Sequence, residues 1–163
     1  MPKLSSFKAL VATVTLLLGG PFCGLVHAQA QAVEVKDAWV RTSVQGQRAT
    51  GAFMKITARE DMRLVGVATP VAGVAEIHEM KMEGDVMKMR AVPALDLPAG
   101  KTVELRSGGY HLMLQELRTA LPRGSTVPVT LVFRNARGVE SRMALQLPVS
   151  TTAPGGGTVT HGH

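Results

Sequence analysis

Cysteine is almost absent from this sequence, which contains only Cys23 among its 163 residues. That cysteine lies within residues 1–30, a segment that we expect to be removed. The rest of the chain then has no thiol, which excludes disulfide bonds and metal sites built on thiolates, including thiolate zinc sites and blue-copper sites. The methionine thioether remains as the soft side-chain ligand of the mature chain.

Residues 1–30 have the composition of a secretory signal peptide. Lys3 and Lys8 make the start basic, residues 9–18 form an apolar run, and small residues follow. We therefore predict an exported protein. Three cleavage positions fit an A-x-A-like site, after Ala28, Ala30 or Ala32.

Long apolar runs are also lacking. Residues 9–18 are too few for a membrane-spanning helix, which needs roughly 20 apolar residues, and no later stretch approaches that length. A lipid anchor on Cys23 is not expected, because Phe22 stands where a lipoprotein signal has a small residue. The sequence therefore predicts no membrane anchor.

Aromatic residues make up only 4% of the chain, and the basic residues are scattered. The formal charge is +6; without Lys3 and Lys8 it is +4, from 16 basic and 12 acidic residues. Nucleic-acid binding usually needs a concentrated basic face with aromatic side chains for stacking. We therefore predict that this protein does not bind nucleic acid.

Short segments of β-type composition recur along the chain, separated by Gly, Pro and Asp. About 130 residues follow the signal segment, the size of one domain, and no window shows a sustained helical period. The pattern predicts an all-β sandwich or barrel for residues 31–150. Residues 95–100 and 121–125 are predicted loops, because Pro and Gly interrupt them. The predicted strands cover residues 37–42, 50–57, 64–68, 74–82, 102–105, 110–116, 127–133 and 139–147.

Residues 151–163 differ in composition from the rest of the chain. The segment reads TTAPGGGTVTHGH and lacks the apolar residues needed to pack against a core. We therefore predict a disordered C-terminal tail.

Methionine and histidine are concentrated in residues 78–113. Five of the eight methionines that follow the signal segment lie there, with both histidines of the predicted β-domain. Imidazole and thioether without thiolate suit Cu(I), whereas Zn²⁺ favours Cys, His and carboxylates, and Ca²⁺ and Mg²⁺ favour oxygen. A metal-free interpretation stays open, because methionine commonly fills a core and a Met-rich face can bind a partner protein. The residues are His78, Met80, Met82, Met87, Met89, His111 and Met113.

Residues 83–86 predict a tight hairpin with Gly-Asp as its two-residue turn. The register pairs Met82 with Met87 and Met80 with Met89. Because side chains alternate along a strand, these four methionines share one face of the hairpin with the preceding histidine. Met89 then lies diagonal to that histidine, within side-chain reach across the strands.

A second strand supplies the other half of the predicted site. His111 and Met113 are two residues apart and share one face, whereas Leu112 and Leu114 point to the opposite, core-facing side. Two strand segments can therefore bring two imidazoles and two thioethers to one point. Thioethers do not titrate, so only the imidazoles compete with protons for a metal ion.

The spacing of these residues resembles a known family. Ten residues separate His78 from Met89, 21 more precede His111, and one precedes Met113. This His-x10-Met-x21-His-x-Met pattern is similar to the signature of the periplasmic Cu(A) copper chaperones, the PCuAC family. Residues 38–41 and 49–54 are also similar to that family, and the resemblance covers about residues 33–149.

The resemblance implies a cupredoxin-like β-barrel that binds one Cu(I) ion through His78, Met89, His111 and Met113. It also implies delivery of copper in the periplasm to the Cu(A) centre of cytochrome c oxidase, with oxidase subunit II or another periplasmic copper chaperone as the partner. Three methionines outside the signature are interpreted either as a transfer ligand set or as surface packing: Met80, Met82 and Met87.

The resemblance extends to the tail. Some family members have a His-bearing C-terminal extension that takes Cu(II), and two imidazoles on a flexible arm suit a cupric ion better than a cuprous one. His161 and His163 are therefore candidate Cu(II) ligands, with an inert tail as the alternative.

Two other functions stay open at this point: a copper-sequestering tolerance protein of the same fold, and a metal-free β-sandwich interaction module. An enzyme is not expected, because no Ser/His/Asp set and no paired-carboxylate motif is apparent.

Overall fold

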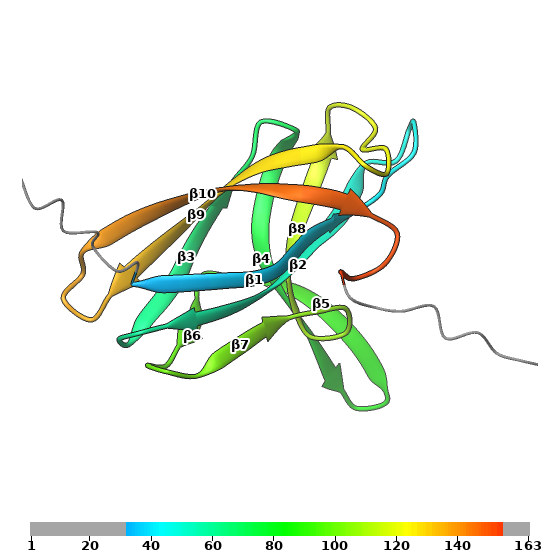
Figure 1. Cartoon of the computed structure of the whole chain (residues 1–163). Helices are drawn as coiled ribbons and strands as arrows, with labels where there is room; N and C mark the ends of the chain where they lie inside the picture. Colours follow the sequence, from blue (N-terminus) through cyan, green and yellow to red (C-terminus); the bar gives the residue numbers. More distant parts are fainter. Residues whose placement is uncertain (1–31, 155–163) are drawn as a thin grey trace, which may run out of the picture. The chain divides into compact units, whose positions relative to one another are not determined.

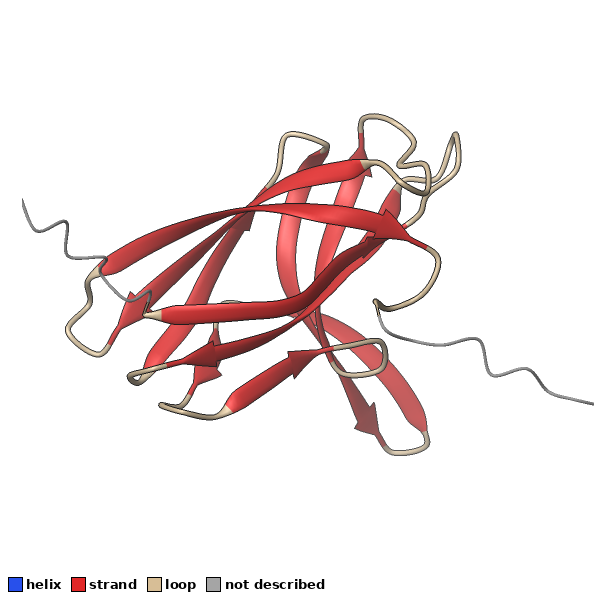
Figure 2. Cartoon of the chain, in the orientation of Figure 1, coloured by secondary structure: helices blue, strands red, loops and turns tan. Residues whose placement is uncertain are grey.

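The computed structural model describes residues 32–154, and the regular structure of this part of the chain consists of β-strands (Figure 2). The all-β prediction is therefore confirmed, and each of the eight predicted segments overlaps a strand. Within the same residues, no helix has the length and hydropathy that crossing a membrane requires. The strands are β1 (Val33–Arg41), β2 (Ala49–Ala58), β3 (Met62–Ala68), β4 (Ala72–Glu83), β5 (Val86–Val92), β6 (Leu95–Leu97), β7 (Thr102–Leu105), β8 (Tyr110–Leu117), β9 (Thr126–Asn135) and β10 (Glu140–Ser150).

The strands form one hydrogen-bonded sheet that folds over on itself into two layers. Its order is β5-β4-β8-β2-β1-β10-β9-β3-β6, and β7 pairs with the second half of β2. A short parallel pairing between β1 and β10, with Val40 opposite Val149, joins the layers. In Figure 1, β10 crosses in front of β4 and β8.

The core lies between the two layers and is built from alternate residues of each strand. Ile77 of β4 and Leu112 and Leu114 of β8 belong to the same buried cluster as Leu131 and Phe133 of β9. Because side chains alternate, the residues next to them on β4 and β8 point to the outer face of the sheet. This outer face therefore carries the histidines of the predicted site.

The predicted hairpin is confirmed, and it connects β4 to β5. Glu83 pairs with Val86, and the register places Met82 opposite Met87 and Met80 opposite Met89. The first turn residue, Gly84, has φ = 63°, a left-handed conformation that glycine adopts without steric cost. The hairpin extends beyond the other strands in Figure 1.

The predicted loop over residues 95–100 is wrong in its first half. Leu95–Leu97 forms β6, which pairs with β3 and buries both leucines, at 4% and 1% exposure. Asp96 between them is exposed and forms an ion pair with Arg63, with 2.8 Å between the oxygen and nitrogen. The Leu-Asp-Leu alternation is a strand pattern, but the Pro and Gly that follow it favoured the loop interpretation.

The first strand begins earlier than its predicted start at residue 37. β1 starts at Val33, and its register with β2 shifts between Lys36 and Trp39. Asp37 at this bulge has φ = 51°. Aspartate tolerates the left-handed region better than most residues do, so the strand continues through the bulge.

Candidate metal centre

The two histidines of the β-domain lie directly opposite each other on neighbouring strands. His78 of β4 pairs with His111 of β8, and their ring centroids are 5.8 Å apart. Both side chains are buried, with 8% and 7% exposed. They lie on the outer face of the sheet, where the sequence pattern placed them. The structure thus brings together two imidazoles that are separated by 32 residues in the chain.

One nitrogen of His78 is held in place, and the other has no partner. Nε2 lies 2.9 Å from Oε2 of Glu76, and the same oxygen accepts a hydrogen bond from Nε2 of Gln115 at 3.1 Å. With Nε2–H donating to the carboxylate, Nδ1 carries a lone pair. Nδ1 is buried and makes no hydrogen bond within residues 32–154. Such an atom is costly unless a ligand satisfies it, and a metal ion would do so.

The ring of His111 is oriented by the backbone. Its Nδ1 lies 3.1 Å from the carbonyl oxygen of Gly109, to which Nδ1–H donates, so Nε2 keeps the lone pair. Burial lowers the pKa of His111 below its usual range, and the neighbouring His78 and Arg41 lower it further, while the hydrogen bond to Gly109 acts in the opposite direction. The neutral imidazole, the form that binds metals, is therefore favoured.

The two signature methionines lie on either side of the histidine pair. Met113 of β8 is half-buried and lies opposite both Glu76 of β4 and Gly51 of β2. Met89 of β5 is 48% exposed and lies diagonal to His78. All four signature residues therefore share one face of neighbouring strands.

The other three methionines of the stretch share this face. Met80 is half-buried and lies between His78 and Met82 along β4, opposite Met89. Met82 and Met87 form the next pair toward the hairpin turn and are 58% and 43% exposed. Met80 therefore also lies next to the histidine pair, two residues after His78 on β4.

Two aromatic side chains that the sequence pattern did not single out, Trp39 and Phe53, border the histidine pair; we call them the aromatic wall. The ring of Phe53 lies 6.5 Å from that of His111 and 4.9 Å from that of Trp39, measured between centroids. The guanidinium carbon of Arg41 lies 5.1 Å from the centre of the Phe53 ring. Gly51 makes room for this ring, since a Cβ there would approach Cζ of Phe53 to 2.8 Å.

Sequence reasoning also missed Glu76 and Gln115, which orient His78. One signal was available for Glu76, because a carboxylate two positions before a histidine on a strand shares its face. Gln115 could not be found in this way, because its contact depends on the register between β4 and β8.

The donor atoms fit a soft metal ion. Within residues 32–154, no three His, Cys, Asp or Glu side chains are grouped to hold a metal. Two imidazoles are present, the Glu76 carboxylate on this face is bonded to His78 and Gln115, and the other donors are thioethers, which favour Cu(I) over Zn²⁺ or Mg²⁺. The residues present therefore fit a cuprous ion. His161 and His163 lie outside the described residues.

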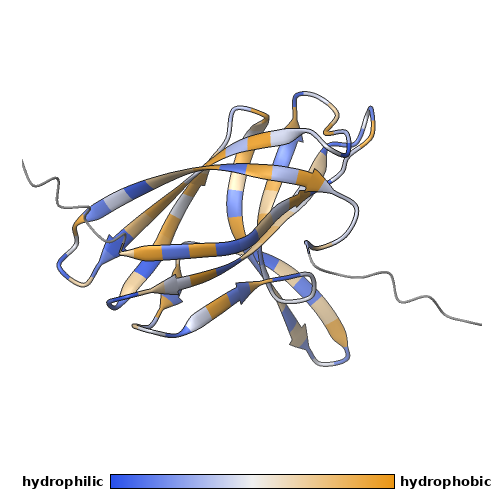
Figure 3. Ribbon diagram, in the orientation of Figure 1, coloured by the Kyte–Doolittle hydropathy of each residue, from blue (hydrophilic) through white to orange (hydrophobic). Residues whose placement is uncertain are grey.

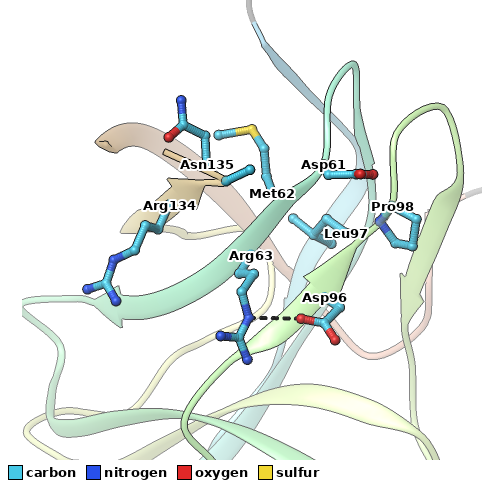
Figure 4. A pocket seen from close by; sticks show the side chains of 9 residues that line it. Asp61, Met62, Arg63, Asp96, Leu97, Pro98, Arg134 and Asn135 are labelled. Atoms are coloured by element: carbon cyan, nitrogen blue, oxygen red, sulfur yellow. Dashed lines mark hydrogen bonds and ion pairs between the residues drawn. The ribbon is translucent and has the colours of Figure 1, made fainter. Parts of the chain in front are cut away.

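A cleft of about 410 Å³ lies elsewhere on the molecule, between β3, β6 and the end of β9. Figure 4 shows Met62, Leu97 and Pro98 along it, with Arg63 bonded to Asp96 at its side. None of the histidines and methionines of residues 78–113 lines this cleft, so it is separate from the candidate metal centre.

Fold and site together define an all-β domain with a candidate soft-metal centre on the outer face of its sheet. A family model described as "LpqE-like: Putative lipoprotein LpqE-like" matches residues 33–149. The chain therefore belongs to the LpqE-like family. The chain is also 33% identical over 143 residues to "Putative lipoprotein Lxx21020" of Leifsonia xyli subsp. xyli (strain CTCB07), covering 82% of this chain and 86% of that protein.

Solved structures show the same fold. The Cu(I) form of DR1885 from Deinococcus radiodurans is 32% identical, with a TM-score of 0.57, covering 77% of this chain and 83% of that chain. The apo PCuAC domain from PmoF1 is 20% identical, with a TM-score of 0.60 and coverage of 75% and 96%, which supports the fold alone. The predicted resemblance to PCuAC domains is therefore confirmed. The prediction that this chain has no membrane anchor concerns Cys23, outside the described residues, and stays a prediction.

Proposed function

We propose that this protein is a periplasmic copper chaperone that binds one Cu(I) ion and passes it to a partner protein. The ligands are His78, Met89, His111 and Met113. One observation carries the proposal: Nδ1 of His78 is buried without a hydrogen bond from any residue of 32–154, beside a second imidazole on a methionine-bearing face. The proposal is also supported by 32% identity to DR1885, whose structure has been determined in a Cu(I) form.

The four ligands differ in how firmly they are held, which suits transfer rather than permanent binding. Glu76 and the carbonyl of Gly109 fix the two imidazole rings. Met89, in contrast, lies on β5, where all residues but the last are exposed. An exposed thioether can leave the metal and be replaced by a ligand from a partner, while the imidazoles keep the ion in place. No covalent chemistry is required, so we propose a non-enzymatic role.

The proposed recipient is a copper-accepting protein, either the Cu(A) centre of subunit II of cytochrome c oxidase or another periplasmic copper chaperone. Cu(I) transfer to a purified Cu(A) domain tests this step. We expect the copper-loaded protein to fill that domain faster than an equal concentration of a small-molecule Cu(I) complex does. Copper that stays on the protein with acceptor in excess would favour sequestration.

Competition with a Cu(I) chelator under anaerobic conditions tests the site itself. The double variant His78→Ala/Met113→Ala loses one fixed imidazole and one thioether. Its affinity should fall by more than the 10- to 100-fold that loss of an outer-shell partner typically costs. The matched control is Met143→Leu, since Met143 lies on β10 in the other layer of the fold. Unchanged affinity in the double variant would overturn the assignment.

The tail is proposed to take Cu(II) through His161 and His163. The last described residues, Ala153 and Pro154, line a cleft together with Trp39 and Phe53 of the aromatic wall, so the described segment ends beside that wall. The variant His161→Ala/His163→Ala should lose one Cu(II) equivalent and keep its Cu(I) equivalent. Cu(II) binding that survives both substitutions would contradict this role.

A further inference from the structure

Four thioethers form a two-by-two array on one face of the β4–β5 hairpin. Met82 lies opposite Met87, and Met80 lies opposite Met89. Directly opposed residues in an antiparallel pair have Cβ atoms about 4.5–5.5 Å apart, and diagonal neighbours are within reach of long side chains. The unbranched thioether side chains can therefore converge on one ion above the hairpin.

Packing does not account for these methionines. Among the described residues, the buried core cluster has no member between residues 78 and 94, and three of these methionines are 43–58% exposed: Met82, Met87 and Met89. Figure 3 shows hydrophobic and hydrophilic residues alternating along the hairpin. The hydrophilic side is already paired: Arg90 bonds Glu79 at 3.0 Å, and Lys88 bonds Glu83 at 2.8 Å. The exposed thioethers have no comparable partners in the described part of the chain.

We propose that Met80, Met82 and Met87 form a second, outer Cu(I) site, which loads the inner centre by ligand exchange. Three thioethers are a soft donor set, and they bind copper without releasing a proton because they are not protonated. The ion stays Cu(I) throughout, so the exchange needs neither an oxidant nor a reductant. The proposal of an outer site depends only on Met80, Met82 and Met87. The loading step also rests on the proposed function, because it needs the inner centre as its acceptor.

The geometry supplies a path between the two sites. Exposure decreases along β4, from Met82 at 58% through half-buried Met80 to His78 at 8%. The backbone N–H of Met80 donates a hydrogen bond to the carbonyl oxygen of Gly109, the residue just before β8, at 3.1 Å. Glycine has no side chain, so none projects from the position across from Met80. Met89 of the proposed inner centre lies opposite Met80 of the outer site, so the two sites are adjacent.

The test uses the full mature chain carrying His161→Ala/His163→Ala, so that the tail histidines do not contribute. Anaerobic titration with Cu(I) against a chelator of intermediate strength should give two equivalents, one tight and one weaker. Adding Met80→Leu, Met82→Leu and Met87→Leu should remove the weaker equivalent, leave the tight affinity within twofold, and slow loading of the inner site at least tenfold. Met143→Leu is the matched control.

Leucine conserves side-chain volume and apolar surface but lacks sulfur. A face used only to dock a hydrophobic partner would therefore survive the triple substitution. A single equivalent in the parent chain, or two equivalents in the triple variant, would overturn the outer site. If the triple variant loses its weaker equivalent but its inner site loads at an unchanged rate, the proposed transfer from the outer site to the inner centre is overturned.

A separate variant distinguishes failure of this inference from failure of the proposed function. His78→Ala/Met113→Ala should keep the weaker equivalent, and X-ray absorption of that copper should show a sulfur-only shell. Nitrogen in that shell would overturn the outer site. Tight binding that persists in this variant would overturn the inner assignment, and the sulfur-only equivalent would still stand.

Discussion

At the scale of the residue, the site depends on which nitrogen of each imidazole is free. Glu76 holds Nε2 of His78, and the carbonyl of Gly109 holds Nδ1 of His111. The two neighbouring rings therefore keep different nitrogens free for a ligand, Nδ1 of His78 and Nε2 of His111. A metal-bound histidine that donates its other N–H to a carboxylate or carbonyl is a recurrent arrangement, because the second bond fixes the tautomer and the ring orientation.

Glu76 should affect copper binding although it is not one of the proposed ligands. Glu76→Gln removes the negative charge that orients His78 and strengthens its donor nitrogen. We expect Cu(I) affinity to fall about 10- to 100-fold, as measured by chelator competition. Glu104→Gln, an exposed carboxylate on β7, serves as the matched control. Equal affinities for the two variants would show that the contact with His78 has no role in binding.

His111 should make the copper-free protein less stable in mild acid. Its pKa is lowered in the folded chain, first by burial, so the unfolded chain binds a proton more readily below the usual histidine pKa of about 6.5. The stability is present above that pH and is lost as the pH falls toward the lower pKa of the folded state. Urea unfolding at pH 7.5 and pH 5 measures this, and His111→Gln should show a smaller difference between the two. An NMR pKa of His111 at or above 6.5 would contradict it.

At the scale of the element, the strands of the site are joined by side chains that lie far apart in the sequence. The aromatic wall needs β1 beside β2 and β2 beside β8, in the register that brings Phe53 to Trp39 and His111. Gly51 is required by this wall, since any Cβ at that position meets the Phe53 ring.

Gly51→Ala should destabilise the fold by about 1–3 kcal/mol, the usual cost of forcing extra atoms into a packed site. Thermal or urea unfolding measures this loss. Gly66→Ala is the control, because a Cβ there would lie 3.4 Å from Cβ of Val132, an ordinary contact. Adding Phe53→Leu to Gly51→Ala should recover part of the loss, because it removes the clashing ring atoms. An equal loss in both glycine variants would contradict this explanation.

Much of the fold and the four signature residues could be predicted from local pattern. The alternation around the Gly-Asp turn defined the β4–β5 register, and the family spacing singled out His78 and His111. The aromatic wall and Gln115 could not be predicted, because their contacts depend on pairings between distant strands. β6 was missed for a different reason: a three-residue strand is too short for alternation to outweigh the Pro and Gly that follow it.

At the scale of the whole molecule, the hydrophobic core and the candidate metal centre lie on opposite faces of β4 and β8. The core between the two layers uses one set of alternate positions on β4 and β8, and the candidate metal centre uses the other set. Substitutions on the outer face can therefore change copper binding without removing core contacts. Likewise, the β4–β5 hairpin carries exposed thioethers because it extends beyond the strands that enclose the core (Figure 1).

The most direct test of the central claim is X-ray absorption spectroscopy of the full mature chain carrying His161→Ala/His163→Ala. The protein should be loaded anaerobically with half an equivalent of Cu(I), so that only the tightest site fills. We expect two nitrogen and two sulfur neighbours around copper. In His78→Ala/Met113→Ala, which lacks the inner centre, we expect copper in the sulfur-only shell of the outer methionines. A shell of nitrogen and oxygen alone, or of sulfur alone, in the parent chain would contradict a centre built on two imidazoles and two thioethers.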